Sequence, residues 1–261
     1  MTMIALVSPG GAPGTTTTAL AASLAWPGQV IMAECDPRGG ALAAGYLAEH
    51  RDHVSGGLLE AGLALAHDPS PEAILPYLLT LPSARHWRLL PGLRDPRQAA
   101  QLDEVWPLLG DALLTAAGRH ADVLVDLGHF GDRETPYALL DMAGLLVAVL
   151  RPTLRQVAAL KPRLEGLGCG SGPGPALPIR LCVIGVGPYT PHDVSQALWN
   201  LPVLAHIPWD PRTAQLLSDG VGRPRRARTS SLIRAAATLA QTIRNSAGAS
   251  LAADPAHGGR R

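Results

Sequence analysis

The chain has 261 residues, of which 47% are hydrophobic and 16% charged, so it can bury a full core and is not a disordered protein. A formal net charge of +1 excludes a global attraction to nucleic acid or anionic lipid, and three cysteines without CxxC spacing fit neither a disulfide framework nor a zinc site. No apolar run approaches the roughly 18 residues of a membrane-spanning helix. We therefore expect a cytoplasmic protein with a single domain over residues 1–245.

Short apolar runs alternate with longer segments of helical periodicity, a pattern typical of parallel strands that are buried on both faces and joined by helices. The expected strands cover residues 3–7, 29–34, 86–90, 121–126, 144–150, 179–186 and 202–207. The expected helices cover residues 16–25, 57–66, 98–117, 153–167, 190–199 and 230–245. This order predicts an α/β fold with a doubly wound, mostly parallel sheet of about seven strands and helices on both faces. Residues 246–261 have little to bury, and we expect a disordered tail there.

A glycine-rich turn, Pro-Gly-Gly-Ala-Pro-Gly-Thr-Thr from Pro9 to Thr16, joins the first expected strand to the first helix. Free N–H groups at a helix start attract anions. In a standard phosphate loop, GxxxxGK[ST], the lysine also reaches the phosphates and the following hydroxyl holds Mg²⁺. Here Pro9 replaces the first glycine, Thr15 occupies the lysine position, and Thr16 keeps the hydroxyl. The turn therefore predicts a phosphate site that lacks its positive charge.

Two residues weaken this predicted loop further. Thr15 cannot form the charge-assisted bonds that a lysine would give to phosphate, and Pro13 has no backbone N–H to donate. Lys161 is the only lysine of the chain and belongs to a distant expected helix, which leaves an arginine from elsewhere as the other source of charge. We expect hydrolysis to suffer more than binding.

The turn resembles the deviant Walker A motif of the ParA/MinD-type P-loop ATPases, KGGxGKTT, and further likenesses extend over roughly residues 3–245. Gly10 stands at the first lysine of that motif, which in the family reaches across a homodimer interface, and Thr15 stands at the second. HIPWD at residues 206–210 resembles a later segment on the base side of the nucleotide. The resemblance implies a nucleotide-binding set made of Gly10, Gly11, Gly14, Thr15, Thr16, Thr17, Pro208 and Asp210.

Two acidic segments extend the resemblance. IMAECDPRGG at residues 31–40 is similar to the DxDPQG motif of the family, which places Glu34 and Asp36 at its acidic, catalytic positions. VLVDLG at residues 123–128 is similar to the Walker B-like strand and places Asp126 near the metal. The implied cofactor is ATP or ADP with Mg²⁺, and the implied metal-binding residues are Thr16, Asp36 and Asp126.

The expected function follows from this resemblance and from the missing lysines. GVGPYT at residues 185–190 replaces the adenine-binding asparagine-arginine pair of the family, and the Pro-Gly-Thr-Thr-Thr turn resembles a divergent actinobacterial branch similar to TadZ/CpaE-type proteins. This implies a positioning or assembly factor for pilus or secretion machinery, with weak nucleotide binding, little or no hydrolysis, and a homodimer that does not depend on nucleotide. The alternative is an active ATPase in chromosome or plasmid partitioning, with partition machinery as the partner.

Other interpretations of the same residues remain open. Glu34 lies twenty residues after Gly14, where a dinucleotide-binding Rossmann protein has its ribose-binding acid, although the GGxxG spacing differs from GxGxxG. The threonines from Thr15 to Thr18 also fit an N-terminal helix cap. Four arginines within six residues are either a solvated loop or a patch for DNA phosphates or an anionic membrane surface. These are Arg223, Arg225, Arg226 and Arg228.

Overall fold

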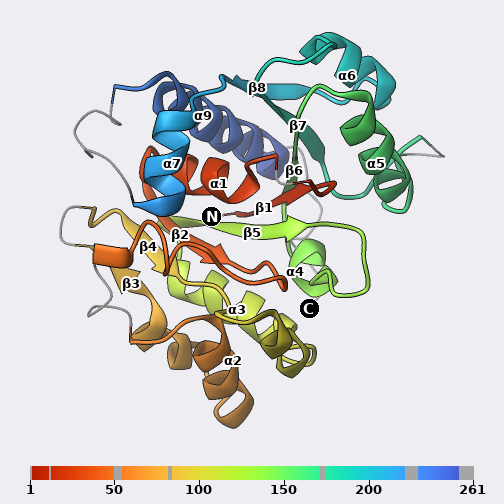
Figure 1. Cartoon of the computed structure of the whole chain (residues 1–261). Coiled ribbons are helices and arrows are strands. Elements are labelled where there is room, and N and C mark those ends of the chain that lie inside the picture. The colour runs from red at the N-terminus through yellow and green to blue at the C-terminus, as the bar shows by residue number, and fades with distance from the viewer. Residues whose placement is uncertain are drawn as a thin grey trace.

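One sheet of eight strands organises the part of the chain that the computed structural model describes, residues 2–11, 13–49, 55–81, 84–170, 174–220 and 229–252. The strands are β1 (Met3–Ser8), β2 (Gln29–Glu34), β3 (Leu79–Thr80), β4 (Trp87–Leu90), β5 (Ala121–His129), β6 (Leu145–Leu150), β7 (Ile179–Ile184) and β8 (Val203–Ile207). Their order is β3-β4-β2-β5-β1-β6-β7-β8, and every neighbouring pair is parallel except β3 and β4 (Figure 1). The predicted α/β class with a mostly parallel, doubly wound sheet is confirmed.

Helices cover both faces of this sheet (Figure 1). The α-helices are α1 (Thr15–Leu24), α2 (Leu58–His67), α3 (Trp106–Ala117), α4 (Tyr137–Asp141), α5 (Leu154–Glu165), α6 (Pro191–Ala197), α7 (Pro211–Asp219) and α9 (Ser231–Ala252), and two 3-10 helices are η2 (Pro71–Tyr77) and η3 (Pro96–Gln101). Helices α1, α7 and α9 pack on one face, and α2 to α6 on the other. Within the described ranges, no helix is both long and apolar enough to cross a membrane.

Strand β1 shows why the sheet is buried on both faces. Met3, Ala5 and Val7 belong to the core under α2 to α6, whereas Ile4 and Leu6 belong to the core under α1, α7 and α9. Successive side chains of a strand point to opposite faces, so an unbroken apolar run serves two cores at once. All five side chains are at most 1% exposed.

The carboxyl ends of β1, β2 and β5 meet at one edge of the sheet. β5 lies between the other two strands, with Asp126 paired in register to Leu6 on one side and to Glu34 on the other. Loops that follow parallel strands collect at this edge, which is where open α/β sheets bind ligands. The glycine-rich turn after β1 and the acidic residues after β2 and β5 are therefore neighbours.

The structure differs from the sequence expectation in several elements. The helix expected over residues 98–117 is divided into η3 and α3, because Pro107 lacks the N–H that a continuous helix needs and is placed in the first turn of α3. The short edge strand β3, the helices α4 and α7, and the 3-10 helix η2 were not predicted. Helix α9 reaches Ala252, so the expected disordered tail is helical over residues 246–252.

Candidate functional site

The glycine-rich turn has the backbone shape of an anion-binding loop. Gly10, Gly11 and Gly14 have φ angles of 98°, 74° and 108°, the left-handed region in which a side chain is strained. Gly14 is the N-cap of α1 and forms no side-chain cap bond, so the first N–H groups of the helix face the turn. The predicted loop-to-helix transition is present.

Thr15 and Thr16 occupy different environments in the first turn of α1. Thr15 is 6% exposed, and its Oγ1 has no hydrogen-bond partner among the described residues. The interpretation of Thr15 as an N-terminal cap is therefore wrong, because Gly14 is the cap and the threonine lies inside the helix. The side chain of Thr16 lies close enough to the carboxyl of Asp126 to lower the pKa of that carboxyl. The loop is thus connected to β5 at the residue predicted to hold the metal.

Asp126 is a fully buried carboxyl beside this loop. Its Oδ1 accepts a hydrogen bond from the N–H of Gly128 at 3.0 Å, while Oδ2 has no partner within the described part of the chain. Burial raises the pKa of Asp126 to about 7, and the charges of Glu34 and Asp36 raise it further. The nearby side chain of Thr16 and the N–H of Gly128 act in the opposite direction. A positive charge next to Oδ2 would lower this pKa and favour the ionised carboxylate.

Asp36 follows β2 and lies against the start of the loop that follows β5. A methyl group placed on Gly128 would lie 1.8 Å from Asp36 Oδ2, so glycine is required at this contact. Asp36 Oδ1 accepts a hydrogen bond from the N–H of Arg38 at 2.9 Å. Burial raises the pKa of Asp36, and the N–H and the charge of Arg38 oppose this. Asp36 and Asp126 therefore lie at one edge, as the resemblance implied.

Glu34 has a different environment from the one expected of a catalytic acid. It is 1% exposed; its Oε1 accepts bonds from the N–H groups of Ala41 at 2.7 Å and Leu42 at 3.3 Å, and its Oε2 accepts from Gly92 N–H at 2.9 Å. Burial raises the pKa of this carboxyl, and the three backbone bonds oppose it. Both carboxylate oxygens are used to hold the loops after β2 and β4, so this geometry favours an anchoring role.

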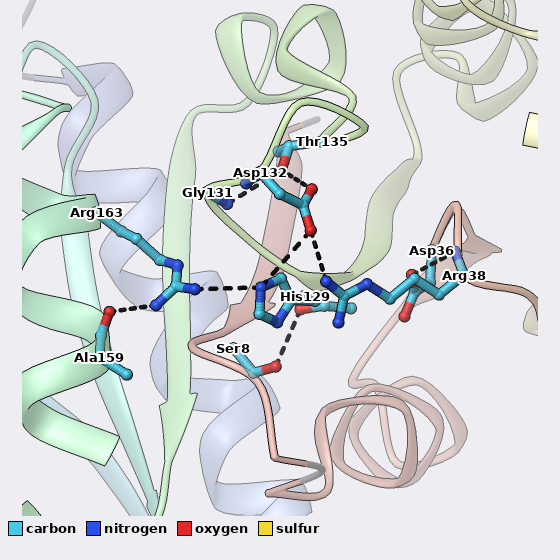
Figure 2. A network of polar contacts seen from close by, with 10 residues as sticks. Ser8, Asp36, Arg38, His129, Gly131, Asp132, Thr135, Ala159 and Arg163 are labelled. Atoms are coloured by element: carbon cyan, nitrogen blue, oxygen red, sulfur yellow. Dashed lines mark hydrogen bonds and ion pairs between the residues drawn. The ribbon is translucent and has the colours of Figure 1, made fainter. Parts of the chain in front are cut away.

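A network of polar residues connects the loop after β5 with the loop after β2 and with α5 (Figure 2). His129 Nε2 accepts a hydrogen bond from Arg163 at 3.2 Å and lies 3.6 Å from Asp132, which pairs with Arg38 at 2.6 Å. Burial, together with the charges of Arg38 and Arg163, lowers the pKa of His129. The lowered pKa favours the neutral ring. Nε2 can accept from Arg163 only when the ring proton is on Nδ1, which has no hydrogen-bond partner among the described residues. Ser8 adds a hydrogen bond to Gly128 carbonyl at 3.1 Å.

Helix α5 brings two residues to the phosphate loop that the sequence did not single out. Gln156 Nε2 donates to the carbonyl of Gly10 at 2.6 Å. A methyl group placed on Gly11 would lie 3.0 Å from that nitrogen and 3.7 Å from Arg155 Nη2. Lys161, further along α5, lies 5.3 Å from the ring centroid of Trp199 and is not directed to the loop. The only signal in the sequence was the position of this helix after the strand at 144–150.

The residues expected on the base side form a separate group at the ends of β7 and β8. Asp210 caps α7, since its Oδ1 accepts from Thr213 N–H at 3.1 Å; the Asp-Pro pair at 210–211 was the available signal for this helix. Pro208 is partly exposed. Next to it, Trp209 is 56% exposed and stacks under Arg151, whose guanidinium carbon lies 4.4 Å from the ring centroid. No hydrogen bond or ion pair joins Pro208 or Asp210 to the described residues of the phosphate loop.

The residues at this edge supply few protein oxygens for Mg²⁺. Among the described residues, no three His, Cys, Asp or Glu side chains converge as a metal-binding group. Mg²⁺ is commonly held by one or two carboxylates together with substrate phosphates and water, which the unpaired Oδ2 of Asp126 and the hydroxyl of Thr16 satisfy. Glu34 adds no free oxygen. The four arginines at 223, 225, 226 and 228 lie outside the described residues.

Comparison with known proteins identifies the fold. No protein-family model and no curated protein sequence matches this chain. Among solved structures, the chain is similar to a ParA family ATPase from Chlorobium tepidum TLS, with a TM-score of 0.73, 16% identity, and coverage of 92% of this chain and 97% of that one. It is also similar to the septum site-determining protein MinD of Pyrococcus horikoshii OT3 complexed with Mg-ADP, with a TM-score of 0.72, 20% identity, and coverage of 95% and 98%. This chain has the ParA/MinD fold.

Another structure with the ParA/MinD fold adds to this finding. It is a putative plasmid partition protein of Borrelia burgdorferi B31 bound to AMPPNP, with a TM-score of 0.68, 13% identity, and coverage of 94% of this chain and 99% of that one. The predicted P-loop NTPase architecture is confirmed, and identities this low establish the fold alone.

The ParA/MinD fold also corrects the alternative of a dinucleotide-binding Rossmann protein. In a Rossmann sheet the first two strands are neighbours, so that the acid at the end of the second reaches the ribose beside the first loop. Here β5 separates β1 from β2. Glu34, which was the candidate for that acid, is held by three backbone N–H groups instead.

Proposed function

We propose that this protein is a positioning or assembly factor that binds ATP or ADP with Mg²⁺ weakly and hydrolyses little or no ATP. The observation that carries this proposal is the phosphate loop, which keeps its left-handed glycines and its helix N-terminus but has Thr15 in the lysine position. Backbone N–H groups suffice to attract phosphate oxygens. The missing lysine removes charge that stabilises the transferring phosphoryl group. Turnover is therefore weakened more than binding.

Mg²⁺ would be held by Thr16 and Asp126, with Asp36 beside them. When bound, the ion would neutralise charge on the phosphates and on the buried carboxyl of Asp126. The Mg-ADP complex of the Pyrococcus MinD, and AMPPNP bound to the Borrelia protein, support a nucleotide as the ligand of this fold. Gly10, Gly11, Gly14, Thr15, Thr16 and Thr17 supply the phosphate side in this proposal, and Pro208 and Asp210 the base side.

The proposed role as a positioning factor rests on the relatives of the fold. Proteins named for septum-site determination and plasmid partition share it, and one structure contains MinD together with MinC. We extend this to a homodimer that acts on a protein partner such as pilus, secretion or partition machinery. Because Gly10 replaces the lysine that reaches across the dimer in the family, the dimer is expected to form with or without nucleotide.

Calorimetric titration with ATP and ADP in Mg²⁺, together with a phosphate-release assay, tests the nucleotide proposal. We expect micromolar binding that is lost in Thr16→Ala, without phosphate release. Thr238→Ala is the matched control, because it removes the same hydroxyl from the exposed side of α9 and should bind as the wild type does. No binding at millimolar nucleotide would overturn the proposal and leave a scaffold that has kept only the fold.

The second candidate is an active ATPase in chromosome or plasmid partitioning. The observation that favours it is the guanidinium of Arg155 close to Gly11, because an arginine can replace a missing loop cation. ATP turnover that is abolished by Asp36→Ala would support this candidate. Absence of turnover at saturating MgATP would exclude it.

A further inference from the structure

The first turn of α5 lies against the phosphate loop, although the two segments are far apart in the sequence. Thr153 caps the helix by accepting from Gln156 N–H at 3.4 Å, and the side chain of Gln156 then donates to Gly10 carbonyl at 2.6 Å. Gln156 is 4% exposed. This buried amide fixes the distance between α5 and the loop, and Arg155 is its immediate neighbour in the chain.

Three other arginines near this edge already have partners. Arg38 pairs with Asp132, and Arg163 donates to His129 and to the carbonyl of Ala159. Arg151 lies over the ring of Trp209. Arg155 is exposed and has no hydrogen bond or ion pair with any other described residue. Its guanidinium lies next to Gly11 and is available to a ligand.

Buried polar atoms beside the loop indicate independently that a ligand belongs here. Thr15 Oγ1, Asp126 Oδ2 and Gln156 Oε1 all lack a hydrogen-bond partner within the described ranges. Thr15, Asp126 and Gln156 are 6%, 0% and 4% exposed. Buried polar groups are normally hydrogen-bonded, and exceptions of this kind gather where a ligand or an ion completes the bonding.

We propose that Arg155 is the phosphate-directed cation of this site, in place of the lysine that the loop lacks, and that Gln156 is its positioning residue. This inference rests on the proposed function, since the ligand is the polyphosphate of ATP or ADP. A guanidinium donates two parallel N–H bonds to phosphate oxygens and remains charged at any physiological pH. In this proposal the charge that binds phosphate comes from the first turn of α5, while the loop itself still lacks the lysine that would stabilise the transferring phosphoryl group.

The test is calorimetric titration of the full chain with ATP, ADP and inorganic pyrophosphate in Mg²⁺. Arg155→Ala is expected to weaken ATP binding by about ten- to one-hundredfold, the loss that corresponds to one hydrogen bond between charged groups. Arg155→Lys should retain an intermediate affinity, because it keeps the charge without the planar fork. The matched control is Arg119→Ala, which removes an exposed arginine before β5, at the opposite edge of the sheet.

The outcomes separate this inference from the proposed function. ATP binding that Arg155→Ala leaves unchanged, with the variant melting at the wild-type temperature, overturns the inference and leaves the proposed function standing. If the wild type binds pyrophosphate but not ATP, and Arg155→Ala no longer binds pyrophosphate, Arg155 is the anion-binding residue. The proposed function as a nucleotide-binding protein is then overturned. If the wild type binds neither ligand, both proposals fail.

Discussion

The imidazole of His129 covers Gly10 so closely that a methyl group on this glycine would lie 2.6 Å from Nδ1. Gly10 also has a φ of 98°, a conformation that costs a residue with a side chain about 1–2 kcal/mol. The position at which the ParA/MinD motif has its first lysine is therefore closed to side chains in this structure.

Gly10→Lys is expected to destabilise the protein and not to restore the motif. One kcal/mol lowers the melting temperature by about 2–4 °C in a chain of this size, and the backbone strain and the contact with His129 add to each other. The double variant Gly10→Lys with His129→Ala should recover the part that is due to the contact. Thermal unfolding measures both, and a Gly10→Lys protein as stable as the wild type would contradict the closed position.

Thr15→Lys, unlike Gly10→Lys, is expected to be tolerated and to strengthen ATP binding. Residue 15 has helical backbone angles, and the buried hydroxyl of Thr15 has no hydrogen-bond partner among the described residues. The lysine would add a charge-assisted bond to phosphate and strengthen ATP binding by about tenfold or more. Titration with ATP measures the gain, and Thr15→Met, a residue of similar length without charge, is the control. Equal affinities of the two variants would show that the loop does not place residue 15 at the phosphates.

Asp126→Asn is expected to stabilise the metal-free protein at high pH. The pKa of Asp126 is about 7 in the folded chain and about 4 in the unfolded chain. Between about pH 4 and pH 7 the carboxyl is therefore protonated in the folded state and ionised in the unfolded state. Stability of the wild type therefore falls as the pH rises from about 4 to 7, and the asparagine variant lacks this loss. Melting curves in a chelator at pH 4.5 and 8 should coincide at the lower pH and separate at the higher one.

The same substitution should weaken MgATP binding, because asparagine cannot be ionised by a metal ion. Improved stability at pH 8 together with unchanged MgATP affinity would remove Asp126 from the proposed metal site.

Glu34→Ala is expected to unfold the protein at lower denaturant concentration, whether or not nucleotide is present. The change leaves three backbone N–H groups, of Ala41, Leu42 and Gly92, without their acceptor, at a cost of about 1–3 kcal/mol for each group that stays buried. Urea unfolding measures the loss. Glu34→Gln should lose less, since one carbonyl oxygen still accepts. A Glu34→Ala protein of wild-type stability that has lost only turnover would instead support a catalytic acid.

Arg38→Gln is expected to raise the pKa of His129. The positive charge of Arg38 lowers this pKa, and removing it also frees Asp132, whose negative charge raises it. NMR titration of the histidine ring follows the change, and Arg97→Gln, which removes an exposed arginine paired with Asp95, is the control. A pKa of His129 that stays constant in Arg38→Gln would show that the network of Figure 2 is not coupled in solution.

The sequence was informative where the signal is local. Apolar runs marked the parallel strands, and the glycines from Gly10 to Gly14 marked a loop that leads into a helix. Asp36 and Asp126 stand out in the sequence because they lie at or just beyond the ends of the strands expected at residues 29–34 and 121–126, although β5 in fact continues to His129. Elements with short or composite signals, such as β3 and the division of residues 98–117, were missed.

Contacts that depend on the order of the strands were not predictable in this way. Arg155 and Gln156 reach the loop because β6 pairs with β1, which places the start of α5 beside the end of β1. The same order decides that Glu34 lies next to Asp126 and not next to β1. The role of Glu34 as an anchor requires the loops after β2 and β4 to meet, and neither loop contains a sequence motif that predicts this contact.

The pairing of Lys161 with Trp199 gives this protein a built-in optical reporter. Since the chain has no second lysine, an amine-reactive dye attaches only to Lys161 and to the terminal amine. The terminal amine has the lower pKa, so it can first be blocked selectively at lower pH. The dye would be located on the same helix as Arg155 and within quenching distance of the indole of Trp199, which lies in the turn after α6. Any shift of α5 that accompanies ligand capture would then be recorded as a change in fluorescence, in real time and without a single cysteine substitution.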